Sequence, residues 1–114
     1  LAKAASLAAS RLLLKTSGCP PEAVEHVIVA GAIGEHLDLD NFRRLGFIPD
    51  FPRANYAYLG NTSLKAAQHC CLNMDFLAQA RAMRDRVREV ALADNPSFQQ
   101  EFLDAIAFPH PGET

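Results

Sequence analysis

The most informative stretch of this sequence is Val27-Ile-Val-Ala-Gly-Ala-Ile-Gly-Glu35. It opens with a run of β-branched residues, which predicts a parallel strand covered on both faces. Two glycines three residues apart, Gly31 and Gly34, then end the strand abruptly. Glycine tolerates positive φ and lets a ligand come close to the backbone. The spacing is therefore typical either of a tight structural turn or of a nucleotide-binding turn, and on its own it does not separate the two.

A second unit of the same kind is Tyr58-Leu-Gly60-Asn61-Thr62-Ser63, which again reads as strand, glycine and helix start. If the two strands are parallel neighbours, both turns emerge at the carboxyl end of the sheet, where open α/β sheets bind ligands. Without any ligand, Gly60 would simply make the turn and Asn61 would cap the helix. The candidate nucleotide-binding residues are Gly31, Ala32, Ile33, Gly34, Gly60 and Asn61.

The rest of the chain predicts an α/β fold with two short parallel strands and about five helices. Strand-helix-strand with buried strands implies a right-handed parallel crossover. The expected order is helix, strand, helix, strand and three further helices, all in a single domain over residues 1–114. The expected helices cover 1–16, 39–45, 62–71 and 73–92, with a last one from 96, and the expected strands cover 24–30 and 55–59.

Composition limits the classes of function. The chain has 114 residues, 49% of them hydrophobic and 21% charged, with 11 Lys+Arg against 13 Asp+Glu. This near-balance differs from the strongly basic face of a nucleic-acid-binding module, so we expect no nucleic-acid partner. No apolar run approaches the roughly 20 residues of a membrane helix, so we expect no membrane partner.

The cysteines and histidines offer no metal site. Cys19, Cys70 and Cys71 contain no Cys-x-x-Cys pair, and we expect three reduced thiols in a cytoplasmic protein. His69 and its two following cysteines would diverge by about 100° per residue on a helix, so they cannot close on one ion. No serine or cysteine stands in a nucleophile motif. The chain itself is expected to contain no catalytic residue and no metal.

Several motifs together resemble one family. The run Val29-Ala-Gly-Ala-Ile-Gly-Glu-His-Leu-Asp-Leu-Asp-Asn-Phe-Arg-Arg-Leu-Gly-Phe-Ile-Pro49 and the helix start Leu59-Gly-Asn-Thr-Ser-Leu-Lys-Ala-Ala67 occur in the family's order. The opening Leu1-Ala-Lys-Ala-Ala and the closing Phe98, Phe102 and Phe108-Pro109 also fit. The chain resembles, over essentially its whole length, the reductive activators of corrinoid proteins, ferredoxin-like proteins with a C-terminal ATPase-like domain.

The resemblance implies a fold and a function. The fold would be a fragment of an actin-like (ribonuclease H-like) ATPase domain, shared with sugar kinases and heat-shock chaperones. The parent protein would bind ATP or ADP and carry a [2Fe-2S] cluster in a ferredoxin domain outside this chain. It would reduce Co(II) to Co(I) in a corrinoid protein or methyltransferase. The turn Gly31, Ala32, Ile33 and Gly34 would touch adenosine, although the family usually has Phe at Ile33 and Gly at Ala66.

The same resemblance implies that the chain is a C-terminal fragment. The phosphate-binding hairpins and catalytic carboxylate of the superfamily would lie upstream, so the fragment itself would be no enzyme. Two strands make a poor sheet alone, and their open edges favour pairing into a homodimer. The alternative is a non-catalytic structural or interaction module with a vestigial nucleotide pocket. Upstream cysteines at ferredoxin spacing would favour the first interpretation.

Overall fold

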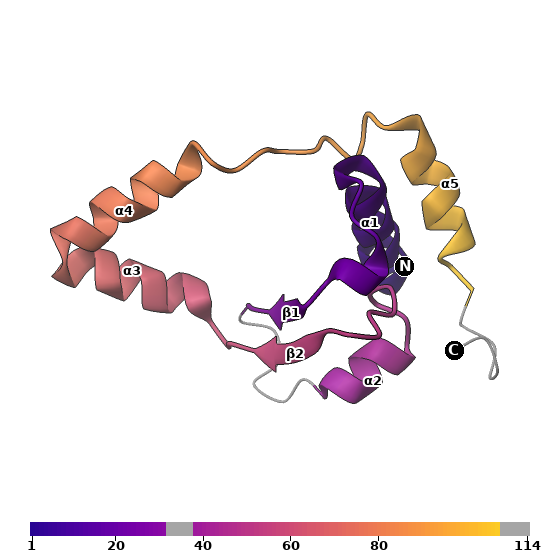
Figure 1. Ribbon diagram of the computed structural model, residues 1–114, viewed down its shortest axis with the longest axis horizontal. Helices are drawn as coiled ribbons and strands as arrows, with labels where there is room; N and C mark the ends of the chain where they lie inside the picture. The colour runs from indigo at the N-terminus through magenta and orange to yellow at the C-terminus, as the bar shows by residue number, and fades with distance from the viewer. Residues whose placement is uncertain (32–37, 108–114) are drawn as a thin grey trace.

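The computed structural model describes residues 1–31 and 38–107, and its elements follow the expected order (Figure 1). In that part of the chain the fold is α/β, with five α-helices and two parallel strands. A short 3-10 helix, η1, joins the first helix to the first strand. The elements are α1 (Ala2–Ser17), η1 (Pro21–Ala23), β1 (His26–Val29), α2 (Leu39–Arg44), β2 (Asn55–Tyr58), α3 (Thr62–Leu72), α4 (Met74–Arg84) and α5 (Pro96–Asp104).

Side-chain caps set the starts of four helices. A cap side chain accepts hydrogen bonds from backbone N–H groups of the first turn that have no partner within the helix. Proline at the first helical position adds to the signal in α5, because its missing N–H would have been unpaired there anyway. The capping residues are Asp38 for α2, Asn61 for α3, Asn73 for α4 and Asn95 for α5.

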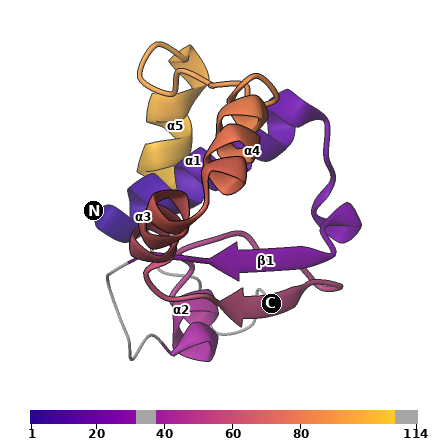
Figure 2. The ribbon, with the colours of Figure 1, turned by 90° about the vertical axis from the view of Figure 1, so that its left-hand side faces the viewer.

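The two strands form a parallel pair with α2 against one face (Figure 2). Val27 lies opposite Tyr56 in the register, and the guanidinium of Arg43 from α2 lies 4.5 Å from the centre of the Tyr56 ring. Ile28, on the opposite face, is 60% exposed. The expectation of a strand covered on both faces is therefore wrong for the described part of the chain. The β-branched run reflects strand propensity here rather than burial on both sides.

The buried core lies where α1 meets α5 (Figure 1). Ala4, Leu7 and Ala105 are buried together, and Phe102 packs against them. The small side chains of Ala4 in α1 and Ala105, which follows α5, allow this close approach. Glu101 of α5 adds ion pairs with Arg11, at 3.9 Å, and with Lys15. Helices α1 and α5 are thus held together by contacts between residues about a hundred positions apart.

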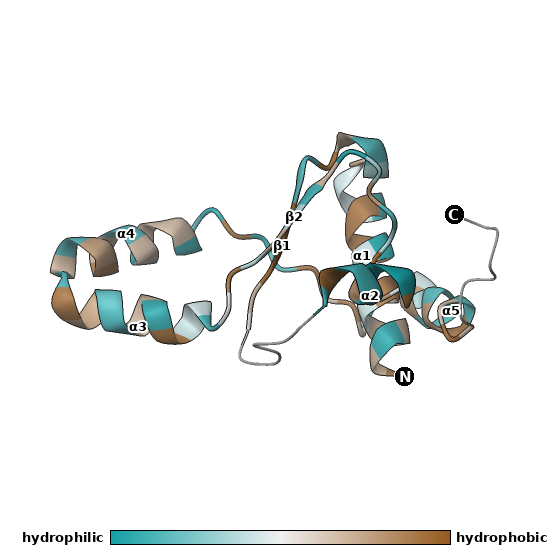
Figure 3. Ribbon diagram, turned by 90° about the horizontal axis from the view of Figure 1, so that it is seen from below, coloured by the Kyte–Doolittle hydropathy of each residue, from teal (hydrophilic) through white to brown (hydrophobic). Residues whose placement is uncertain are grey.

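The α3–α4 hairpin projects away from this core (Figures 1 and 3). The two helices contact each other, with the rings of His69 and Phe76 5.4 Å apart. No residue of either helix is buried. The radius of gyration is 16.3 Å, whereas a compact domain of this length has about 13 Å. The molecule is therefore extended, with apolar side chains such as Leu72 left on its surface.

Helix α4 is shorter than expected. The apolar spacing predicts a helix from Asn73 to about Leu92, but α4 ends at Arg84 and the chain continues without regular structure. That prediction rests on an apolar stripe at steps of four and three, formed by Phe76, Ala80, Met83, Val87 and Val90. In the structure, Val87 is 74% exposed. Helices in proteins owe most of their stability to packing of an apolar face, and β-branched residues weaken a helix that lacks such packing. The prediction was wrong because the second half of the stripe has no packing surface among the described elements.

Candidate functional site

The two glycine turns lie side by side at the carboxyl end of the sheet. The N–H of Leu59 donates to the carbonyl of Val29 at 2.9 Å, which extends the strand ladder by one step. The N–H of Gly31 then donates to the carbonyl of Gly60, also at 2.9 Å. The structure thus brings together Gly31 and Gly60, each the first glycine after its strand. Ala32, Ile33 and Gly34 lie outside the described residues.

Both glycines are required by their backbone conformation. Gly31 has a φ of +145° and Gly60 a φ of +69°, and side-chain-bearing residues rarely adopt either value. A Cβ atom added at either position would meet no described atom within 4 Å. Among the described residues, no neighbouring side chain therefore crowds these backbones. Open space beside a fixed backbone is what the close approach of a ligand requires.

Tyr58 joins the two turns and was missed by sequence reasoning. Its hydroxyl donates to the carbonyl of Gly31 at 2.9 Å, in a partly buried position. The only available signal is the alternation of the strand, which places Tyr58 opposite Val29 and hence at the end of the pair. Alternation does not reveal that the hydroxyl reaches the carbonyl of Gly31, two residues after Val29. Gly31 is therefore held at both its N–H and its carbonyl.

Asn61 and Lys65 lie at the same end of the sheet. The Asn61 side chain accepts a hydrogen bond from the N–H of Leu64 at 3.1 Å, which is the capping role expected without a ligand. Lys65 reaches back from the first turns of α3, and its Nζ donates to the carbonyl of Leu59 at 3.2 Å. This contact places an exposed ammonium group beside the Gly60 turn. Sequence reasoning had not singled out Lys65.

The charged groups near α2 have a structural role. Arg43 pairs with Asp50, with 3.3 Å between the nitrogen and the carboxylate oxygen, and its guanidinium lies over the Tyr56 ring. The hydrogen bond that the Arg43 guanidinium donates to the Asp50 carboxylate is the main cause that raises the pKa of Arg43 above its usual value. The hydroxyl of Tyr56 is buried and has no hydrogen-bond partner in the described part of the chain. This cluster fastens α2 to the sheet.

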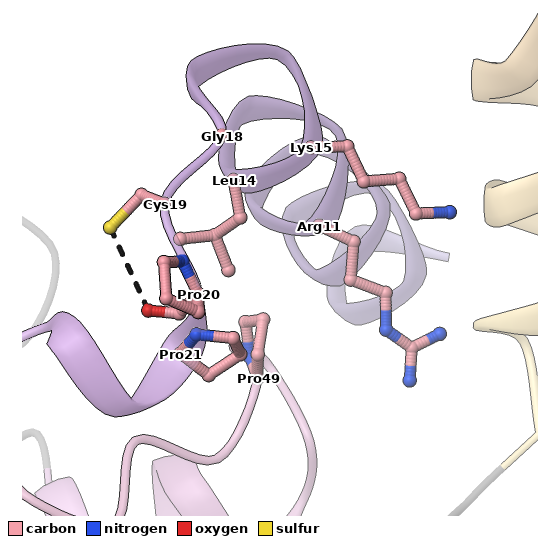
Figure 4. Close-up of a pocket in the computed structure, with 8 residues that line it drawn as sticks. All are labelled: Arg11, Leu14, Lys15, Gly18, Cys19, Pro20, Pro21 and Pro49. Carbon is pink, nitrogen blue, oxygen red and sulfur yellow. Dashed lines mark hydrogen bonds between the residues drawn. The ribbon is translucent and has the colours of Figure 1, made fainter.

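A cavity of about 610 Å³ lies elsewhere, beside the end of α1 (Figure 4). Its wall is largely apolar and includes Leu14 and the prolines Pro20, Pro21 and Pro49. These prolines precede β1 and β2 in the chain, so the cavity lies near the amino ends of the strands. It contains none of the six candidate residues. The Cys19 thiol on its edge donates to the carbonyl of Pro20 at 3.7 Å.

The described residues contain neither a grouped set of metal ligands nor a membrane-spanning helix. Within residues 1–31 and 38–107, no three His, Cys, Asp or Glu side chains are grouped so that they could hold a metal. His69 packs against Phe76, and Cys71 is exposed. None of the helices in this part of the chain has the length and apolar character needed to cross a membrane.

The fold and the paired turns define an α/β protein of the class whose ligand sites lie at the carboxyl ends of parallel strands. Comparison with known families makes this specific. The family described as the C-terminal domain of RACo, the ASKHA domain, matches residues 1–114. The chain belongs to this family, and its fold is that of a fragment of an actin-like domain.

Two curated relatives are similar to most of the chain. The corrinoid activation enzyme RamQ of Eubacterium limosum is 26% identical over 103 residues, which cover 90% of this chain and 17% of that protein. The [Co(II) methylated amine-specific corrinoid protein] reductase of Methanosarcina barkeri is 27% identical over 103 residues, covering 89% of this chain and 19% of that protein. The chain therefore spans less than a fifth of the length of these two relatives.

Proposed function

We propose that this chain is the C-terminal part of a nucleotide-binding domain, in which the Gly31 and Gly60 turns form the wall against the adenosine of ATP or ADP. The observation that carries the proposal is the hydrogen bond from Gly31 to Gly60, which joins the two glycine turns at the carboxyl end of the strands. Membership of the ASKHA family supports it, because nucleotide binding is expected of such domains.

The described residues fit a nucleoside better than a phosphate chain. The N–H and carbonyl of Gly31 are already bonded within the protein, so Gly31 would offer a flat backbone surface rather than free donors. No described atom lies within 4 Å of a Cβ added at either glycine, so the described residues leave both backbones accessible to a ring system or a ribose. Lys65 is a charged group at this end, and its ammonium could reach a ribose or phosphate oxygen. Ala32, Ile33 and Gly34 remain part of the proposed site.

For the whole protein we propose the reductive activation of a corrinoid protein. Both curated relatives carry names that concern corrinoid activation or the reduction of a corrinoid protein. An electron from a [2Fe-2S] ferredoxin domain outside this chain would convert Co(II) to Co(I) in a corrinoid protein or methyltransferase. ATP would supply the free energy for this unfavourable step. The chain itself would contribute no catalytic residue, and the protein would be cytoplasmic and homodimeric.

The test uses the full-length protein. ATP and ADP binding is measured by titration calorimetry, and the Co(II) to Co(I) conversion of a corrinoid protein is followed by its visible spectrum with and without ATP. We expect saturable nucleotide binding and ATP-dependent reduction. The isolated 114 residues should show neither ATP hydrolysis nor a ferredoxin spectrum. A full-length protein that reduces its partner equally well without ATP and binds no nucleotide would contradict the proposal.

The second candidate is a structural or interaction module with an unused nucleotide pocket. The observation in its favour is the projecting α3–α4 hairpin, which carries exposed apolar side chains, among them Leu64 and Leu72. Exposed apolar surface of this kind is typical of contact surfaces between proteins. Nucleotide titration separates the two candidates, because the module would bind no ATP or ADP.

A further inference from the structure

We propose that Tyr58 is a positioning residue for nucleotide binding, because its hydroxyl fixes the Gly31 peptide beside the Gly60 turn. This inference rests on the proposed function and adds to it a residue that belongs to neither glycine motif. Its basis is the hydrogen bond of 2.9 Å from the Tyr58 hydroxyl to the Gly31 carbonyl.

Gly31 needs such a restraint. A glycine can adopt many more backbone conformations than other residues, so a glycine turn left alone samples shapes that do not match a ligand. Here the Gly31 N–H is bound to Gly60 and its carbonyl to Tyr58. These two hydrogen bonds select one orientation of the peptide at a φ of +145°. A backbone ordered before binding loses less conformational entropy when the ligand arrives.

Tyr58 is also well placed to stay rigid. It is in register with Val29, and both residues are half-buried on the face of the sheet that α2 covers. Its side chain therefore extends from a regular strand rather than from a loop. The restraint on Gly31 is therefore transmitted from the paired strands.

Tyr56 provides a matched control. It lies two residues earlier on β2, on the same face, and its hydroxyl is buried with no hydrogen-bond partner among the described residues. Changing Tyr56 to Phe removes a hydroxyl that makes no such bond, whereas changing Tyr58 to Phe removes the contact to Gly31. Both substitutions delete one oxygen atom from the same face of the same strand.

The experiment compares Tyr58→Phe and Tyr56→Phe in the full-length protein. We expect Tyr58→Phe to weaken ADP binding about 3- to 10-fold, the loss expected for one hydrogen bond. Tyr56→Phe should leave the affinity unchanged. Thermal melting of each ligand-free variant defines a temperature at which both are folded, and the titrations are done there. Equal ADP affinities for the two variants would overturn the proposal.

Hydrogen exchange separates this inference from the proposed function. In the ligand-free protein, Tyr58→Phe should accelerate exchange of the Gly31 amide relative to Tyr56→Phe, because the turn opens more often. An unchanged Gly31 exchange rate in Tyr58→Phe would show that the hydroxyl does not position this peptide. If the unsubstituted protein binds no ADP, the proposed function fails, and the role of Tyr58 in binding fails with it.

Discussion

At the scale of the residue, Gly31 and Gly18 make an instructive pair. Both have positive φ, at +145° and +66°, and neither has a described atom within 4 Å of an added Cβ. Gly18 ends α1, where its N–H bonds to the carbonyl of Lys15. Gly31 instead lies at the end of the strand pair. A side chain therefore strains the backbone at either position, but only Gly31 lies at the proposed nucleotide site.

The first prediction uses this pair. Gly31→Val in the full-length protein should weaken ATP binding more than tenfold, or about 1.4 kcal/mol, because the valine both strains the turn and fills the space the nucleoside needs. Gly18→Val should lower the melting temperature but leave the affinity unchanged. Calorimetric titration with ATP and thermal melting measure the two effects. If folded Gly31→Val binds ATP as tightly as the unsubstituted protein, the turn has only a structural role.

The residues of the candidate site differ in how far the sequence could indicate them. Gly31, Gly60 and Asn61 were predictable, because a glycine after a strand and an asparagine before a helix have local physical reasons. Tyr58 and Lys65 were not, because each acts through a contact that depends on how the chain returns on itself. The preference of a residue for a turn or a helix cap depends on its neighbours in the sequence. The contacts of Tyr58 and Lys65 depend on the path of the whole backbone.

At the scale of the element, the starts of the helices were easier to predict from the local sequence than their ends. Helices α2, α3, α4 and α5 begin at or within one residue of their expected starts, at Leu39, Thr62, Met74 and Pro96. The end of α4 was missed, and so was the open face of β1. Both expectations assumed that every apolar face packs against another element of the chain. Apolar spacing shows which face could be buried, but only the tertiary arrangement decides whether it is.

The second prediction concerns the core between α1 and α5. Leu7 is 7% exposed and belongs to the core, while Leu13 on the same helix is 46% exposed. Leu7→Ala should lower the free energy of unfolding by about 2–4 kcal/mol, from lost burial and the cavity left behind. Leu13→Ala should change it far less. Urea unfolding followed by circular dichroism tests the difference, and equal effects would contradict the placement of the core.

The third prediction concerns the end of α4. Proline in a helix interior removes a hydrogen bond and costs about 3 kcal/mol, but it is tolerated outside regular structure. Ala80→Pro, inside α4, should reduce the helical signal in circular dichroism. Arg88→Pro, four residues beyond the last helical position, should leave that signal intact. A comparable loss of helix in Arg88→Pro would mean that α4 continues toward Leu92, as its apolar spacing first indicated.

At the scale of the whole molecule, the described chain leaves much apolar surface uncovered. The sheet has two strands, each with an open edge, and Ile28 is exposed on its free face. The α3–α4 hairpin extends from the rest of the chain without burying a residue. Open strand edges and exposed apolar faces promote association. The isolated chain should therefore not remain a monomer.

The last prediction tests which surface drives this association. The isolated 114 residues should form a dimer or larger species at moderate concentration, as measured by light scattering, and should bind a dye specific for exposed apolar surface. Ile28→Lys adds a charge to the free face of the sheet and should shift the population toward monomer, because pairing there would bury an unpaired ammonium. Leu72→Lys makes the same chemical change at the end of α3, at a residue that is 86% exposed, and should have little effect.

A monomer without dye binding would contradict the prediction of association. A shift toward monomer in Leu72→Lys alone would instead place the contact on the hairpin and favour the interaction-module candidate.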